Sequence, residues 1–123
     1  MTPFKLTLDA VKAAAREAYA KGELGFQKGE QSCQYTGDAT GAPCAVGAAL
    51  PKEVRQFVGM SHWLNGRGVE TLAKEGIVKV LPSELGPIAE IQSAHDSIIH
   101  AQRDGETYLI RECVRRFEAG IAE

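Results

Sequence analysis

Apolar residues recur at helical spacing near the start of the chain. Leu8, Val11 and Ala15 lie three or four positions apart in an alanine-rich segment. This spacing places side chains on one face of an α-helix. Gly22 follows the last periodic residue, and glycine commonly ends a helix because it tolerates a left-handed backbone. The pattern therefore predicts an amphipathic helix over 8–21.

The same periodicity returns in two longer segments at the end of the chain. In the last of them, Cys113 and Phe117 belong to a continuous apolar stripe, the mark of a helix that packs one face on a core. An Asp-Gly pair at 104–105 separates the two segments and is typical of a turn. We therefore expect two long helices, over about 83–103 and 106–121.

Between these ends, glycines and prolines divide the chain into short pieces. Three glycines in Gly22–Gln31 predict a loop around a buried Phe26. Proline is favoured at the first position of a helix because its missing N–H has no helical partner there. The segments predicted are a strand over Ser32–Thr36, a turn over 37–41, helices from Pro43, over Pro51–Val58 and over Val69–Glu75, and a strand or helix over Ile77–Leu81.

Taken together, these elements predict an α+β fold that is predominantly helical. We expect about five helices and a small two-stranded β element, with Ser32–Thr36 pairing with Ile77–Leu81. The 123 residues form a chain of single-domain length and contain no long linker. We therefore expect one domain over residues 1–123.

Charge and composition exclude several classes of protein. The net charge of −2 argues against the clustered basic surface that binds nucleic acid without sequence preference. Three cysteines without a C-x-x-C motif argue against a secreted disulfide scaffold. The N-terminal residues lack the apolar core of a signal peptide, and the longest apolar runs are too short to span a bilayer. The expected protein is cytoplasmic and not bound to a membrane.

Cys44 is the residue whose position most strongly suggests a reactive thiol. It lies at the start of the short helix predicted from Pro43, where outward-pointing backbone N–H groups favour a thiolate. One interpretation is a catalytic set in which Cys44 is the nucleophile, His95 or His62 the base, and Asp96 or a nearby asparagine the group that orients the base. The other is that Cys44 is a small apolar residue buried in a tight turn.

A structural zinc site is a further alternative. Cys33 and Cys44 could provide two ligands, and His62, His95 or Cys113 could complete the four. The two cysteines lack the close spacing typical of zinc ligands. In the simplest interpretation Cys113 belongs to the core, and His95, which lies on the apolar face of its helix, is a hydrogen-bonded core residue.

Aromatic and basic residues gather around a glycine-rich turn in the middle of the chain. Phe57, His62 and Trp63 precede Arg67 there. The rings could stack on a nucleobase and the arginine could neutralise a phosphate, while the backbone around Cys44 could form an anion nest. The alternative is that Trp63 covers the core and Arg67 is solvated.

Two motifs carry a resemblance to known proteins. The first is C-x-Y…G-x-P-C-A-V-G-A-x-L-P and the second is I-x-x-A-H-D. Both resemble a group of small uncharacterised proteins of phages and prophages. The resemblance implies a viral or bacterial cytoplasmic setting, and it suggests that Cys33, Cys44 and the His95–Asp96 pair meet in space. The matching residues are Cys33, Tyr35, Gly41, Cys44, Ala45, Val46, Gly47, Leu50, Pro51, Ile91, Gln92, His95 and Asp96.

The leading hypothesis is a non-catalytic binding protein of phage or prophage origin that needs no cofactor. It would counteract a host process such as defence by capturing a small anionic, nucleotide-like ligand or a host protein. The alternatives are a cysteine-dependent hydrolase or transferase that uses Cys44 and His95, and a structural zinc-binding protein. A homo-oligomer is compatible with each. The residues expected to contact the ligand are Phe57, His62, Trp63, Arg67 and Cys44.

Overall fold

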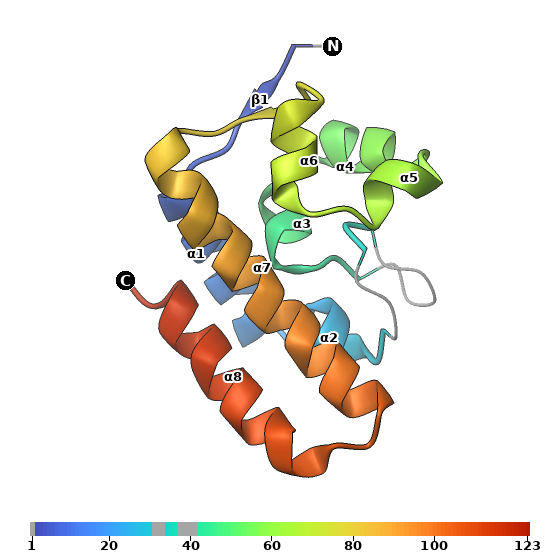
Figure 1. Cartoon of the computed structure of the whole chain (residues 1–123), viewed down its shortest axis with the longest axis vertical. Coiled ribbons are helices and arrows are strands. Elements are labelled where there is room, and N and C mark those ends of the chain that lie inside the picture. Colours follow the sequence, from blue (N-terminus) through green and yellow to red (C-terminus); the bar gives the residue numbers. More distant parts are fainter. Residues whose placement is uncertain (1, 31–33, 37–41) are drawn as a thin grey trace.

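The fold of the protein is known from a computed structural model that describes residues 2–30, 34–36 and 42–123. As predicted, this part of the chain is α+β and predominantly helical, with a small two-stranded sheet (Figure 1). It contains five helices of six residues or more and three shorter ones. The helices are α1 (Leu8–Ala20), α2 (Gly25–Lys28), α3 (Ala45–Ala49), α4 (Lys52–Gly59), α5 (His62–Asn65), α6 (Val69–Lys74), α7 (Pro82–Arg103) and α8 (Thr107–Ile121).

The predicted amphipathic helix near the N-terminus is confirmed as α1. The Thr7 hydroxyl accepts a hydrogen bond from the Ala10 N–H at 3.1 Å, which satisfies one of the amide groups that a helix start leaves unpaired. Val11 and Ala15 are buried on the inner face. Gly22 follows with φ at +70°, a left-handed conformation that glycine adopts without strain.

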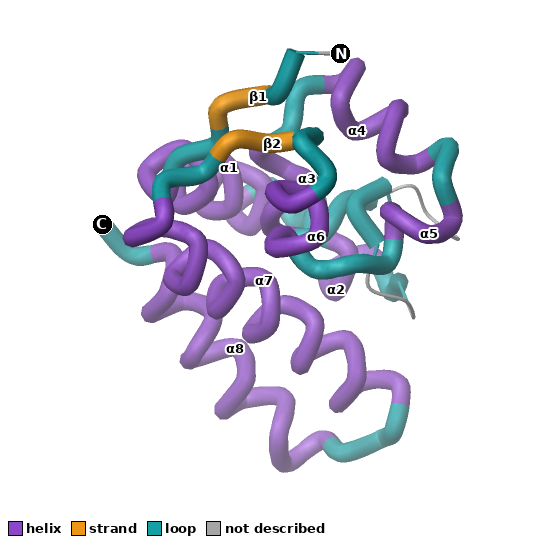
Figure 2. Tube along the Cα trace, turned by 45° about the horizontal axis from the view of Figure 1, so that its top comes forward, coloured by secondary structure: helices purple, strands orange, loops and turns teal. Residues whose placement is uncertain are grey.

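The small sheet pairs different segments from those predicted. β2 (Val78–Lys79) lies within the predicted strand over Ile77–Leu81, but it pairs in parallel with β1 (Phe4–Lys5), and the two strands lie side by side in Figure 2. The Phe4 N–H donates to the Ile77 carbonyl at 3.0 Å. A two-residue strand shows too little alternation of apolar and polar residues to be recognised from sequence.

In the described residues the predicted pairing of Ser32–Thr36 with Ile77–Leu81 is not found, because β2 pairs with β1 instead. The described part of the first segment, residues 34–36, is irregular. Its backbone is bound elsewhere, because the Tyr35 N–H donates to the Asn65 side-chain oxygen at 3.0 Å. Cys33 and the predicted turn over 37–41 lie outside the described residues.

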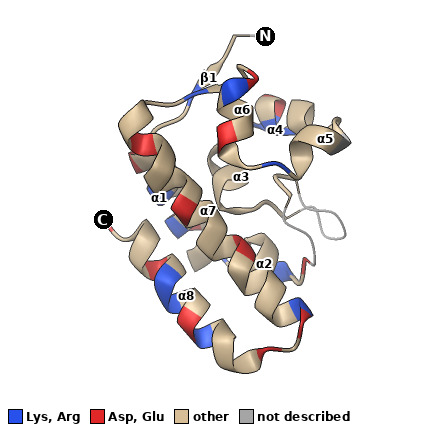
Figure 3. Cartoon of the chain, viewed as in Figure 1, with Lys and Arg blue, Asp and Glu red and all other residues tan. Residues whose placement is uncertain are grey.

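The long helix α7 is the centre of the fold. It runs antiparallel beside α8 (Figures 1 and 2) and also contacts α1, α2, α3 and α6. Its inner face carries the buried residues Ile88, Ile91 and Ile98. Lys and Arg alternate with Asp and Glu on the outer side of α8 (Figure 3). Within the described residues, no helix combines the length and apolar character needed to cross a bilayer.

Candidate functional site

Cys44 lies at the start of α3, as its sequence context predicts. It is the N-cap of the helix, and its Sγ accepts a hydrogen bond from the Gly47 N–H at 3.4 Å. Its own N–H donates to the Gln34 carbonyl at 3.3 Å. Only 2% of the residue is exposed. The thiol therefore points along the helix start inside the protein, where a substrate would need an opening to reach it.

The backbone N–H groups at the start of α3 are used by the protein itself. The Val46 N–H donates to Gln92 Oε1 of α7 at 2.9 Å, and those of Cys44 and Gly47 have the partners just described. An anion nest binds through N–H groups that point to an open concavity. At the start of α3, the N–H groups of Val46, Gly47 and Cys44 instead donate to Gln92, Cys44 Sγ and Gln34 of the protein itself.

Gly47 allows the segment at Tyr35 to press directly against α3. A Cβ at position 47 would overlap the carbonyl oxygen of Tyr35. The buried Tyr35 ring extends past α3, and its hydroxyl donates to the Arg67 carbonyl at 2.7 Å. Burial raises the pKa of the Tyr35 hydroxyl, and the acidic groups of Cys44, Asp96 and Glu70 raise it further.

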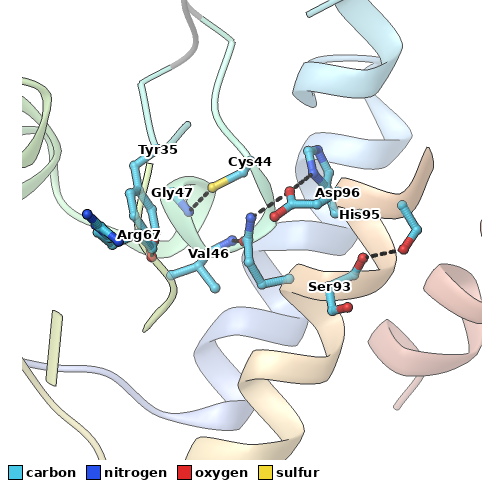
Figure 4. A network of polar contacts seen from close by, with 10 residues as sticks. Tyr35, Cys44, Val46, Gly47, Arg67, Ser93, His95 and Asp96 are labelled. Carbon is cyan, nitrogen blue, oxygen red and sulfur yellow. Dashed lines mark hydrogen bonds and ion pairs between the residues drawn. The ribbon is translucent and has the colours of Figure 1, made fainter. Parts of the chain in front are cut away.

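On α7, three polar side chains form a chain of hydrogen bonds from the core to the surface (Figure 4). Gln92 Nε2 donates to Asp96 Oδ1 at 2.9 Å, and His95 Nδ1 lies 3.0 Å from the same oxygen. Because a carboxylate oxygen only accepts, Nδ1 carries the proton in this contact. His95 is 0% exposed, whereas the Asp96 side chain is 24% exposed.

The second ring nitrogen of His95 is buried. Within the described residues, Nε2 has no hydrogen-bond partner. The imidazole packs edge-on against Phe26 and Phe117, with ring centroids 5.4 and 6.0 Å away. An imidazole with Nδ1–H on a carboxylate and a bare Nε2 has the arrangement of a general base, but the His95 side chain is 0% exposed.

The two sequence motifs meet in space through Val46 and Gln92. Of the residues proposed for catalysis, Cys44 and His95 lie in the interior and Asp96 lies at the surface end of the network. Cys33, named as a zinc ligand, lies outside the described residues. Of the other alternative ligands, Cys113 is half-buried on α8. In the described part of the chain, no three His, Cys, Asp or Glu side chains are grouped to hold a metal ion.

The aromatic and basic residues of the middle segment lie at the surface. Phe57 of α4 is 43% exposed and Trp63 of α5 is 51% exposed. The guanidinium carbon of Arg67 lies 5.1 Å from the centre of the Trp63 ring, within the range of a cation–π contact. The side chain of His62 lies outside the described part of the structure. Trp63 therefore presents much of its surface to solvent.

Two polar residues that the sequence analysis did not single out hold this segment in place. The Ser61 hydroxyl accepts from the Leu64 N–H at 3.2 Å and caps α5. The Asn65 side-chain oxygen accepts from the Tyr35 N–H, and its Nδ2 donates to the Thr36 hydroxyl at 3.0 Å. Ser61 could have been recognised from the sequence, because a serine directly before a helix is a typical N-cap. No local pattern marks Asn65, because its partners lie about thirty positions earlier.

A groove opens between the start of α6 and the middle of α7, with a volume of about 350 Å³. Asp96 lines it, so the buried network of α7 reaches the surface here. Glu70 faces it from α6, and it was also not singled out from the sequence. The lining residues are Gly68, Val69, Glu70, Ala89, Gln92, Ser93, Asp96, Ser97 and His100.

Comparison with known proteins adds no relative to this description. No protein-family model, no curated protein and no solved structure matches the chain.

Proposed function

We propose that this is a non-catalytic binding protein that takes up a planar, anionic, nucleotide-like ligand on the surface of α4, α5 and the turn after α5. The observation that carries the proposal is the exposed Trp63 ring with the Arg67 guanidinium 5.1 Å from its centre. A half-exposed tryptophan adds little to a core, but it offers a wide surface on which a base can stack.

Charge and anchoring support the same proposal. Within the described residues Arg67 makes no ion pair, so its donors can meet a phosphate, which guanidinium groups bind in a bidentate manner. The Arg67 backbone is fixed by the Tyr35 hydroxyl. Phe57 adds a second exposed ring on α4, a helix that contacts α5. A fixed backbone lowers the entropy lost when the ligand binds.

Because Trp63 is the only tryptophan, its fluorescence reports on stacking directly. We expect AMP, ADP or cyclic AMP to quench this emission saturably and to raise the melting temperature. Arg67→Gln should weaken binding about ten-fold, the usual value of a charged hydrogen bond. Arg111→Gln, which removes an exposed arginine on α8, is the matched control and should bind as the natural protein does. Absence of quenching and of stabilisation by every nucleotide would remove this function.

The setting proposed for this activity is a phage or prophage protein in the bacterial cytoplasm that counteracts a host process such as defence. This part of the proposal is supported by the sequence resemblance alone. Native mass spectrometry on protein purified from bacterial cells tests it, because a captured nucleotide, a host protein and a second copy of the chain each give a different mass. Apo monomer alone would speak against capture.

A cysteine-dependent hydrolase or transferase is the second candidate, favoured by the hydrogen bond of His95 to Asp96. It requires Cys44 to become accessible and to ionise easily. Alkylation with iodoacetamide over a range of pH measures both properties. If the protein only binds, Cys113, which is half-buried, should react before Cys44. Rapid modification of Cys44 at neutral pH would favour the enzyme.

A further inference from the structure

We propose that the groove between α6 and α7 binds a ligand bearing an ammonium or guanidinium group, with Asp96 and Glu70 as its charge partners. This site uses none of the residues assigned to the nucleotide-like ligand and calls for the opposite charge. It therefore goes beyond the proposed function.

The groove has the size and polarity of a small-ligand site. Its volume of about 350 Å³ lies in the range of about 300–1,000 Å³ that ligand pockets occupy. The lining includes two carboxylates, the hydroxyls of Ser93 and Ser97, and the imidazole of His100. None of the described residues that line it is Lys or Arg. A concave surface with acidic groups of one sign concentrates cations.

Asp96 is held in position by donors that come from the core. Both Gln92 Nε2 and His95 Nδ1 bond its Oδ1, and Gln92 is itself fixed by the Val46 N–H. Gln92 and His95 are buried, and burying such polar side chains costs free energy that apolar residues would not. The result is a surface carboxylate with a fixed orientation on a long helix, the support that binding residues require.

Glu70 supplies the second carboxylate from the opposite wall. It is exposed at the start of α6, and its Oε1 lies so close to Gly68 that a Cβ at position 68 would be 2.8 Å away. Glu70 from α6 and Asp96 from α7 line the same groove. A cation between the two walls would be attracted by both carboxylates.

The lining favours an organic cation over a metal ion. In the described residues no three potential ligand side chains group together, as a metal would require. The N–H groups of an ammonium or guanidinium can instead donate to the carboxylates and to the serine oxygens. Ala89 provides an apolar contact for an unbranched aliphatic chain. Such a group belongs to a free polyamine or to a lysine or arginine side chain of another protein.

The test uses putrescine and agmatine as free cations, and the acetyl-amide derivatives of lysine and arginine as side-chain mimics. We expect saturable shifts of the amide NMR signals of Gly68, Ser93 and Ser97 with at least one of them, and none with the neutral 1,4-butanediol. Binding by putrescine or agmatine assigns a free amine, and binding by the amino-acid derivatives alone assigns a protein side chain.

Variants separate this site from nonspecific charge. Asp96→Asn should weaken binding about ten-fold or more, because a fixed, charged hydrogen-bond acceptor is lost. Glu70→Gln should weaken it about three-fold, as expected of an exposed ion pair. Glu90→Gln, on α7 outside the groove lining, is the matched control and should leave affinity unchanged.

Three outcomes would overturn the proposal: no saturable shift with any cation, an equal response to butanediol, or the same loss of affinity in the Glu90 and Glu70 variants. Glu70 is exposed, so its substitution keeps the test valid even if Asp96→Asn unfolds. Nucleotide quenching of Trp63 should be unchanged in Glu70→Gln, so that failure of either site can be recognised without the other.

Discussion

The contact between α3 and α7 and the surface formed by α4 and α5 use reactive residue types in opposite ways. At the first, Cys44, Gln92 and His95 are buried, and their side chains bond to backbone N–H groups or to Asp96. At the second, Trp63 is half in solvent and Arg67 stacks on it. The comparison teaches that a cysteine and a histidine can hold the interior together while a less reactive pair, Trp63 and Arg67, lies at the surface.

The two regions differ because of how each short helix is enclosed. α3 has five residues and lies between the Tyr35 backbone and α7, so its amides find partners on both sides. α5 is fastened at its ends by Ser61 and Asn65. Fastening at the ends leaves the outward face of α5 uncovered. Substitutions can therefore test whether the contact between α3 and α7 contributes to stability while the surface of α4 and α5 does not.

Gly47→Ala should have the largest effect on stability. The added Cβ would overlap the Tyr35 carbonyl oxygen, and a backbone atom cannot rotate away as a side chain can. We expect a loss of about 3 kcal/mol in the free energy of unfolding, at the upper end for overpacking in a core. Urea denaturation followed by circular dichroism measures this quantity.

Gly86→Ala is the matched control on α7, where a Cβ would meet nothing within 4 Å. Because alanine favours a helix interior over glycine, this variant should gain about 0.5–1 kcal/mol. If Gly47→Ala proved as stable as the natural protein, the close approach of Tyr35 to α3 would not be a constraint and the enclosed character of this region would be in doubt.

Gln92→Leu should have the next largest effect. Leucine has a similar size, but it leaves the buried Val46 N–H without an acceptor and removes a donor from Asp96. An unsatisfied buried N–H costs about 1–3 kcal/mol, and we expect a loss of about 2 kcal/mol. Thermal and urea unfolding measure it. Gln102→Leu, at an exposed position of the same helix, should change stability by less than about 0.5 kcal/mol; equal losses in both variants would contradict the role of the network.

Much of the helical framework is predictable from the sequence. The bounds of α1, α7 and α8 agree with the expected ranges to within one residue at each end. These helices are long, and their apolar periodicity and flanking turns can be recognised from neighbouring residues alone. The sheet is not predictable in the same way. β1 is two residues long, and its partner β2 lies more than seventy positions later, so no local pattern connects them.

For the candidate site, the sequence predicts positions along the chain but not accessibility. It correctly predicts Cys44 at the start of a helix. However, Gln92, which accepts from the Val46 N–H, comes 46 positions after Val46. Whether a helix start is open or closed depends on such distant partners. The contact between Trp63 and Arg67 is different, since four positions separate them and a turn brings them together.

Trp63→Leu should have the smallest effect on stability and the largest on ligand binding. Because the ring is half-exposed, its loss should change the free energy of unfolding by less than about 0.5 kcal/mol. Calorimetric titration with AMP should show binding weakened at least ten-fold, since stacking on one aromatic ring contributes about 1–3 kcal/mol per base. Tyr108→Leu, at another exposed aromatic residue, should match it in stability and keep the full affinity. A large loss of stability in Trp63→Leu with unchanged affinity would reverse the comparison, because the tryptophan would then support the fold and the ligand would have to bind elsewhere.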